Sequence, residues 1–239
     1  MTKSGRGDGS RRRPRPRNTR NRPTDEQLLD AARAVVADFG VERSTMDMIA
    51  ERGGTTRVTL YAHFGSRDAL VERMIARELA SFTDWMVAAY DESEDMSYGA
   101  RAKHSVEATF EYARRNPEGL RLLLGRRQES EGPGRQLYKT LEPRVAERLR
   151  QNYAARGAEI DASADTLASL LIGISLDVCY RALIVESADI DIACDIAVTA
   201  TLAVLRAVRP DQLLALDASL AEEAGDQANS AATSAARRN

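Results

Sequence analysis

The chain has 239 residues, of which 43% are hydrophobic and 29% charged, values typical of a soluble globular protein with one large domain or two small ones. Asp177 and Arg181 interrupt the longest apolar stretch, and the arginine-rich N-terminus lacks the apolar segment of a secretory signal, so we expect a cytoplasmic protein without a membrane span. The two cysteines, Cys179 and Cys194, are too few for a disulfide framework and lack the spacing of a zinc site.

Positive charge is concentrated at the N-terminus. Residues 1–23 contain eight arginines and Lys3 against Asp8 alone, a net charge of +8, so the rest of the chain carries −10 within the total of −2. This segment is rich in proline and glycine and nearly free of apolar side chains, which predicts a disordered arm. The asymmetry favours an electrostatic partner, most often nucleic acid, whereas an arginine-rich tail without a partner is the alternative.

The first predicted helix follows the arm. Thr24 and Gln27 have the spacing of a capping box, which marks a helix start, and Gly40 marks its end. No proline occurs from Thr24 to Asn116, which permits long helices. The apolar residues of this segment recur at helical spacing: Leu28, Ala32, Val35, Val36 and Phe39.

Two short helices are predicted next. Ser44 is expected to cap the start of the second helix, and Asp47, three residues later, to bond back to the cap. Gly53-Gly54 is expected to end this helix. Thr56 caps the third helix, which ends at Gly65. Together with the first helix they fit a helix-turn-helix of about forty residues.

The rest of the chain is also predicted to be helical, because no period-2 alternation is long enough for a strand. Ser66 caps a long fourth helix with Leu70, Met74, Leu79, Phe82 and Met86 along one side. A loose helix is expected over 211–223, followed by a disordered end. Proline and glycine turns separate the intervening helices, which we place near 98–115, 117–127, 135–141, 143–156, 162–186 and 189–208. The predicted fold class is all-α.

The third helix has the polarity of a recognition helix. It directs Leu60 and Phe64 inward and its other side chains outward. Thr56 offers its hydroxyl and the first backbone N–H groups to a phosphate, and Arg57 can present a bidentate fork to a guanine edge. Arg67, at the start of the next helix, can contact the phosphate backbone of the nucleic acid. The full outward set is Thr56, Arg57, Thr59 and His63.

The same segment contains a specific pattern: Thr45-x-x-x-Ile49-Ala50, Gly54, and Thr59-Leu60-Tyr61-x-His63-Phe64-x-Ser66-Arg67-x-x-Leu70. It resembles the signature of the TetR family of one-component transcriptional regulators, and the resemblance covers residues 24–70 without gaps. In that family the DNA-binding helices precede a diverse all-α domain that binds a small molecule and dimerises. The resemblance implies phosphate contacts for Thr45, Thr56, Tyr61, His63 and Arg67, and base contacts for Arg57, Val58 and Thr59.

Two residues depart from the family pattern. Thr55 stands where valine is usual, and Val58 stands where a smaller residue or proline is commoner; Val58 offers an apolar group to a thymine methyl. Some motif residues also have simpler interpretations, since Tyr61 can be partly a core residue and Arg67 can pair with Asp68 or Glu72. In the arm, we expect Arg20 and Arg22 to enter the minor groove or contact phosphates.

A dimer on a palindrome is expected, because one recognition helix reads too few base pairs to select a site. The helices near 162–186 and 189–208 are the candidate interface, and a four-helix interface built from two helices of each chain matches the family pattern. Burial within one chain is the alternative. The apolar residues concerned are Leu167, Leu171, Ile174, Val178 and Val185 on the first helix, and Ala193, Ile196, Ala197, Ala200 and Val204 on the second.

The effector site is less clearly marked. Candidates are aromatic or polar residues on otherwise apolar helices, and core packing or surface exposure is the alternative for each: Phe82, Trp85, His104, Phe110, Asp177 and Tyr180. Few charges are available to line a cavity, so we expect a small, mostly apolar effector. The family implies that this ligand favours a dimer with mis-spaced recognition helices and so relieves repression.

We predict a regulator and not an enzyme. The sequence has two histidines, no glycine-rich phosphate loop, no metal-ligand cluster and no nucleophile motif, so neither a cofactor nor a metal is expected. The domains are then an arm (1–23), a DNA-binding domain (24–66), an effector-binding and dimerisation domain (67–209) and a tail (210–239). The alternatives are a nonspecific architectural DNA binder driven by the arm, and a helical interaction protein with a vestigial DNA-binding domain.

Overall fold

The computed structural model describes residues 23–125, 133–185 and 188–236, and all regular secondary structure in these ranges is helical, which confirms the all-α prediction. The helices are α1 (Asp25–Phe39), α2 (Met46–Arg52), α3 (Arg57–Phe64), α4 (Arg67–Glu92), α5 (Tyr98–Arg115), α6 (Pro117–Leu124), α7 (Pro133–Ala154), α8 (Ala162–Tyr180), α9 (Ile190–Ala207) and α10 (Pro210–Ala236). One turn of π-helix, η1 (Arg181–Val185), continues α8. The predicted arm, with Arg20 and Arg22, lies outside the described residues.

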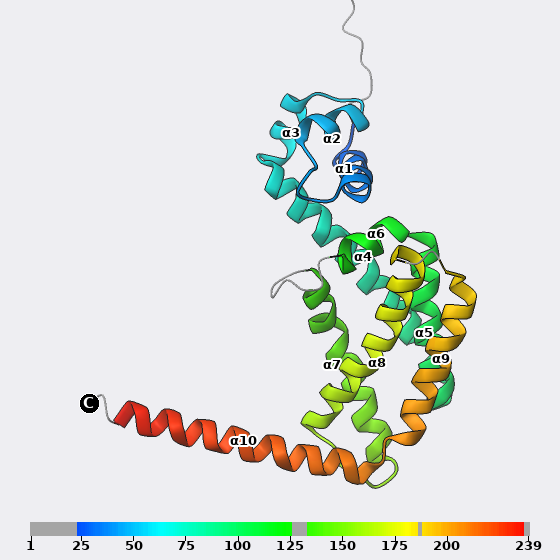
Figure 1. Ribbon diagram of the computed structural model, residues 1–239, viewed down its shortest axis with the longest axis vertical. Coiled ribbons are helices and arrows are strands. Elements are labelled where there is room, and N and C mark those ends of the chain that lie inside the picture. The colour runs from blue at the N-terminus through cyan, green and yellow to red at the C-terminus, as the bar shows by residue number, and fades with distance from the viewer. Residues whose placement is uncertain (1–22, 126–132, 186–187, 237–239) are drawn as a thin grey trace, which may run out of the picture.

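Three apolar cores organise the molecule. The first joins α1, α2, α3 and the start of α4, with Leu122 of α6 packed beneath them. The second joins the rest of α4 to α5, α6, α7, α8 and α9. The third lies where α7, α8, α9 and the start of α10 meet. Figure 1 shows α1, α2 and α3 gathered at one end of the molecule and the longer helices bundled below.

Helix α4 belongs to two of these cores. Its first turns bury Leu70 and Met74 among the N-terminal helices, and its last turns bury Met86 and Tyr90 in the larger bundle. At 1.5 Å rise per residue, its 26 residues span about 39 Å. Helix α4 therefore links the N-terminal helices to the larger bundle.

Local capping follows the sequence at three helix starts. Thr24 and Gln27 form the predicted capping box of α1, and Thr56 and Ser66 cap α3 and α4. At α2 the prediction was one residue early, because Thr45 is the cap and accepts the Met48 N–H at 3.3 Å. The buried hydroxyl of the preceding serine is already used, since it donates to a carbonyl at the end of α1.

The structure corrects three further expectations. Residues 135–141 and 143–156 form one helix, α7, that continues through Pro143. Proline removes a helical hydrogen bond, but Leu141 and Leu149 on either side of it are buried in the bundle and keep the helix continuous. Helix α10 extends to Ala236 instead of ending near 223, in keeping with its alanine-rich sequence. Phe39, expected on the apolar face of α1, is exposed.

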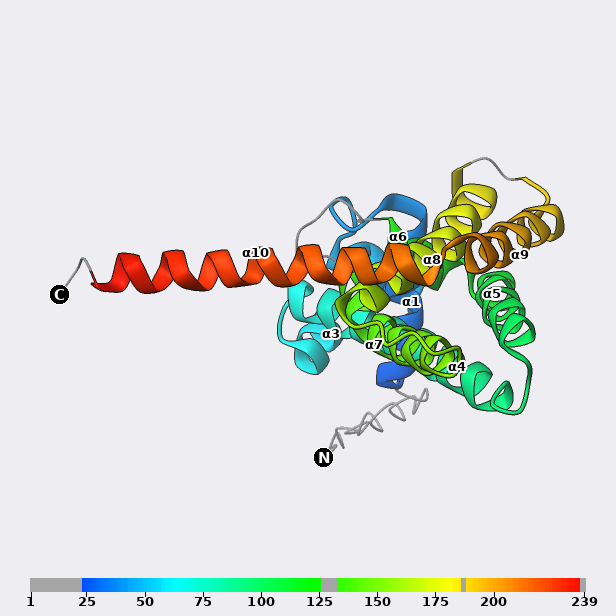
Figure 2. The same ribbon diagram turned by 90° about the horizontal axis from the view of Figure 1, so that it is seen from below.

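Helix α10 projects away from the bundle in both Figure 1 and Figure 2. Its base is held by Leu213, which is buried in the third core, and by Asp217. The Asp217 carboxylate accepts hydrogen bonds from the Asp161 and Ser163 backbone N–H groups at 2.9 and 2.6 Å and from the Ser163 hydroxyl at 2.9 Å. These bonds join α10 to the N-terminus of α8.

Candidate functional site

Helix α3 presents one face to solvent because its other face is fixed in the first core. Leu60 and Phe64 are buried, whereas the side chain of Val58 is 78% exposed and that of Tyr61 46% exposed. The Thr56 hydroxyl accepts the Thr59 N–H at 3.1 Å and fixes the first turn of the helix. An exposed valine on a short, rigidly capped helix is available for contact with a partner surface.

The structure brings most of the predicted DNA-contacting residues onto this helix or beside it. Six lie on α3 or at its cap, and Thr45 caps α2, the helix before the turn. Arg57 is exposed and pairs with Asp47 of α2, with Nη1 3.2 Å from the carboxylate. The six are Thr56, Arg57, Val58, Thr59, Tyr61 and His63.

His63 and Arg67 are held by contacts within the protein. His63 Nδ1 lies 2.5 Å from Oδ1 of Asp25 at the start of α1. The hydrogen bond from His63, together with the nearby Arg73 guanidinium, lowers the pKa of Asp25 below its usual value. Arg67 pairs with Asp68 at 3.0 Å and donates from Nε to the carbonyl of Ser44 at 2.8 Å. His63 thus joins α3 to the start of α1, and Arg67 joins the start of α4 to the segment between α1 and α2.

A buried carboxylate that sequence reasoning missed lies between the first two cores. Glu78 of α4 is 2% exposed and accepts from Arg77 and Asn116 at 2.9 Å each and from Arg33 of α1 at 3.4 Å. The signal was present, because the buried positions of α4 recur every four residues and Glu78 falls between Met74 and Phe82. Sequence analysis had placed the neighbouring leucine there.

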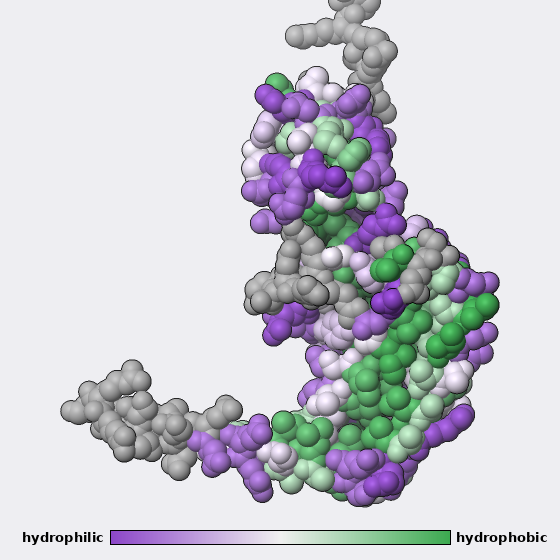
Figure 3. All heavy atoms as spheres, in the orientation of Figure 1, coloured by the Kyte–Doolittle hydropathy of each residue, from purple (hydrophilic) through white to green (hydrophobic). Residues whose placement is uncertain are grey.

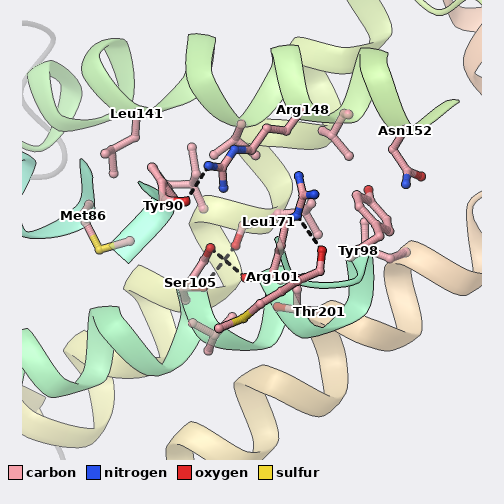
Figure 4. A pocket seen from close by; sticks show the side chains of 18 of the residues that line it. Met86, Tyr90, Tyr98, Arg101, Ser105, Leu141, Arg148, Asn152, Leu171 and Thr201 are labelled. Atoms are coloured by element: carbon pink, nitrogen blue, oxygen red, sulfur yellow. Dashed lines mark hydrogen bonds between the residues drawn. The ribbon is translucent and has the colours of Figure 1, made fainter. Parts of the chain in front are cut away.

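A cavity of about 490 Å³ opens inside the larger bundle, between α4, α5, α7, α8 and α9. Figure 4 shows side chains converging on it from several helices. The lining of α5 recurs at helical spacing along one face: Tyr98, Arg101, Ala102, Ser105, Val106 and Thr109. This mixed face of small, polar and cationic residues is the signal that would have located the cavity in the sequence.

None of the six predicted effector residues lines this cavity. Phe82 and Phe110 are fully buried in the second core, and Trp85 donates from Nε1 to the Ala108 carbonyl at 2.8 Å. His104 lies 3.6 Å from Glu92. The other two, Asp177 and Tyr180, are half-buried on α8. The two phenylalanines chosen from the sequence as candidate ligand contacts are core residues instead.

An apolar surface covers α8 and α9, visible as a continuous hydrophobic area in Figure 3. Its exposed members include Leu170 on α8 and Ile192 and Ile196 on α9, the last two 60% and 58% exposed. Of the residues predicted for an interface, several are instead buried in the chain's own cores, because these helices also pack on α5 and α7. They are Leu167, Leu171, Ala193 and Ala197.

Residues Ala162–Leu183 are long and apolar enough to cross a membrane, but the core helix of a helical protein meets the same criterion, and this helix contributes buried residues to two cores. Among the described residues, no group of three or more His, Cys, Asp or Glu side chains could hold a metal ion.

Solved structures show the same fold. The regulator FadR from Bacillus halodurans, described as a fatty acid degradation regulator, superposes with a TM-score of 0.63 at 16% identity, covering 75% of this chain and 95% of that one. SmeT, the repressor of the Stenotrophomonas maltophilia multidrug efflux pump SmeDEF, gives 0.58 at 24% identity, covering 76% and 90%.

Curated relatives match part of the chain. The transcriptional activator FasR of Mycolicibacterium smegmatis is 35% identical over 104 residues, 42% of this chain and 47% of its own length. The repressor KstR2 of Mycobacterium tuberculosis is 33% identical over 69 residues, 29% and 32%. The chain therefore spans less than half the length of these curated relatives. The family model for bacterial regulatory proteins of the tetR family matches residues 28–74, which contain α2, α3 and most of α1. Residues 28–74 therefore match the tetR family of bacterial regulatory proteins, and the chain shares the fold of TetR-like regulators.

Proposed function

We propose that the chain is a sequence-specific DNA-binding transcriptional regulator, a ligand-responsive repressor that acts as a homodimer on a palindromic operator. The observation that carries the proposal is the exposed face of α3, where Arg57 and Val58 follow the N-cap residue Thr56 directly. The named relatives include an activator as well as repressors, and all are transcription regulators. The proposal assigns the chain no catalytic activity.

In this proposal α3 enters the major groove with Arg57, Val58 and Thr59 at the base edges. Arg57 would exchange Asp47 for a guanine edge, since their ion pair is exposed and easily broken. Phosphate contacts come from the helix starts, from the flanking side chains and from the arm: Thr45, Thr56, Tyr61, His63, Arg67, Arg20 and Arg22.

The dimer would form through the apolar surface of α8 and α9. Leu170, Ile192 and Ile196 are large apolar side chains left in solvent on adjacent helices, and a contiguous surface of this kind marks a protein interface. A second copy covers it symmetrically, because the same surface meets itself across a two-fold axis. Residues 24–66 then act as the DNA-binding domain and residues 67–209 as the effector-binding and dimerisation domain.

The response to ligand would run through α4. Met86 and Tyr90 line the cavity, whereas Leu70 and Met74 of the same helix pack under the DNA-binding helices. A ligand that shifts α4 in the bundle would change the spacing of the two recognition helices in the dimer. A coupling free energy of about 1–3 kcal/mol, which is typical of such linkage, lowers operator affinity by roughly 5- to 150-fold.

The test is selection of bound sequences from a random duplex pool with the full chain at physiological salt. We expect a palindrome that binds two chains, and reporter expression from it decides between repression and activation. Arg57→Ala should cost about 1–3 kcal/mol and relax selection at one base position of each half-site. Arg52→Ala is the matched control, because it removes an exposed, ion-paired arginine from α2 instead of α3.

Retained DNA without enrichment of any sequence would replace this proposal with the alternative, a nonspecific binder driven by the basic arm. Unchanged selection with Arg57→Ala would remove α3 as the reading element.

A further inference from the structure

Two arginines face the cavity without an acidic partner. Arg101 of α5 donates from Nε to the Met96 carbonyl at 2.8 Å, and Arg148 of α7 donates to the Tyr90 carbonyl at 2.7 Å. Within the part of the chain that the structure describes, neither guanidinium lies within 4.0 Å of a carboxylate. A half-buried cation without a counter-ion is unusual, because burial costs hydration that hydrogen bonds to carbonyls restore less completely than an opposite charge does.

Neighbouring arginines on α7 show the ordinary arrangement. Arg144 pairs with Asp91 at 4.0 Å and Arg150 with Asp165 at 2.9 Å. Arg148 lies between them in sequence but stacks on the Tyr90 ring, 4.8 Å from its centroid. Burial, and to a smaller extent the positive charge of Arg101, lower the pKa of Arg148.

Unpartnered polar atoms line the same cavity. The side-chain oxygens of Tyr98, Asn152 and Thr201 are buried and have no hydrogen-bond partner in the structure. Burial raises the pKa of Tyr98, so its hydroxyl stays protonated and can donate. Buried polar groups are normally satisfied, so three unpartnered oxygens around one cavity favour an occupant that can form hydrogen bonds.

The cavity also has an apolar end. Figure 4 places Met86 and Leu141 at one end, Tyr98 and Asn152 at the other, and the two arginines between them. The volume of about 490 Å³ lies within the range of small-molecule sites. A molecule that satisfies all of these groups needs a charged, hydrogen-bonding head and an apolar chain.

We propose that the cavity binds an anionic amphipath, with its acidic head group between Arg101 and Arg148 and its apolar chain directed toward Met86 and Leu141. The proposal rests on the proposed function, in which this cavity is the effector site, and it replaces the mostly apolar effector expected from the sequence. A neutral apolar ligand would strip water from two guanidinium groups and three polar oxygens without giving them partners. An anion gives the arginines charge-assisted hydrogen bonds.

Calorimetric titration of the full chain with three twelve-carbon probes tests the proposal: dodecanoate and dodecyl phosphate below their micelle concentrations, and dodecan-1-ol below its solubility limit. We expect at least one anion to bind about tenfold or more tightly than the alcohol. The two anions distinguish a carboxylate from a phosphate head. Equal affinity for the alcohol, or no binding of either anion, overturns the proposal.

Variants then locate the head group. Arg101→Met and Arg148→Met, which keep an unbranched side chain but remove the guanidinium group, should each weaken anion binding about tenfold and leave alcohol binding unchanged. Arg150→Met is the matched control from the same helix, because that arginine is paired with Asp165 and does not line the cavity. Thermal melting of each variant checks the fold. Equal effects of all three substitutions contradict the assigned head-group site.

Operator binding, measured with and without the anion, separates the two proposals. Selective operator binding without anion binding leaves the regulator standing and rejects the ligand class. Anion binding without selective DNA binding supports the ligand class and rejects the regulator.

Discussion

Glu78→Gln tests the junction between the N-terminal helices and the bundle. The two carboxylate oxygens of Glu78 accept three hydrogen bonds, from Arg33, Arg77 and Asn116. Glutamine keeps the shape of the side chain but replaces one oxygen by an NH₂ group, which then faces a donor. The substitution also removes the negative charge between two guanidinium groups.

The cost can be bounded from the surroundings. Removing one partner of a buried ion pair typically costs 3–5 kcal/mol when the other charge is left alone. Here Arg77 keeps Glu26 and Asp30, at 3.0 and 2.9 Å, and Arg33 keeps Glu118 at 3.2 Å. The loss is therefore nearer that of charge-assisted hydrogen bonds, about 2 kcal/mol of unfolding free energy.

Glu118→Gln is the matched control. Glu118 pairs with the same Arg33 guanidinium, but its side chain is 46% exposed, so its loss should cost less than about 1 kcal/mol. Urea unfolding followed by the fluorescence of Trp85, the single tryptophan, gives both values from the shift of the midpoint at unchanged m-value. Equal midpoints for the two variants would refute the argument that burial makes Glu78 the stronger partner.

Two further predictions concern packing and pH. Gly119→Ala should destabilise the fold by about 1–3 kcal/mol, because a Cβ at this position would lie 2.5 Å from Glu78 Oε2. Gly225→Ala is the control: a Cβ there, on exposed α10, meets nothing within 4 Å, so the substitution should be neutral or slightly stabilising. Equal shifts of the melting temperature for the two variants would contradict this prediction. Burial alone would raise the pKa of Asp217, but the hydrogen bonds from the Asp161 and Ser163 backbone and the Ser163 hydroxyl outweigh it and hold the pKa below the usual value. Stability from a carboxyl with a lowered folded-state pKa is present above the unfolded pKa of about 3.9 and lost as pH falls through the folded value. Asp217→Asn should therefore cost about 1 kcal/mol at neutral pH, and its difference from the unsubstituted chain should shrink below about pH 4; a difference that does not change with pH would count against the assignment.

The sequence predicted the N-terminal helices well because their signals are local. The caps at Thr24, Thr56 and Ser66 each bond a backbone N–H three residues ahead, so the pattern and the bond lie in one short segment. The motif that identified the family spans residues 45–70, and the structure places it on α2, α3 and the start of α4. The error at Ser44 also has a local cause, since two adjacent hydroxyl residues compete for one cap.

The remaining features depend on contacts between distant segments. Whether Pro143 breaks a helix depends on Leu141 and Leu149 packing into the bundle, and whether Ala193 and Ala197 lie at an interface depends on which face of α9 meets α5. The sequence marks such residues as apolar without stating which surface covers them.

Residue type, spacing and capping by themselves predicted the helical class, the short capped helices at the N-terminus and the resemblance of residues 24–70 to the TetR family. The tertiary structure alone decided that Glu78 is buried against Arg33, 45 residues away, and that Arg101 and Arg148 face one cavity without acidic partners. The physical reason is that a helix is specified by interactions within four residues, whereas the burial, pairing or isolation of a charge depends on all the helices that pack around it.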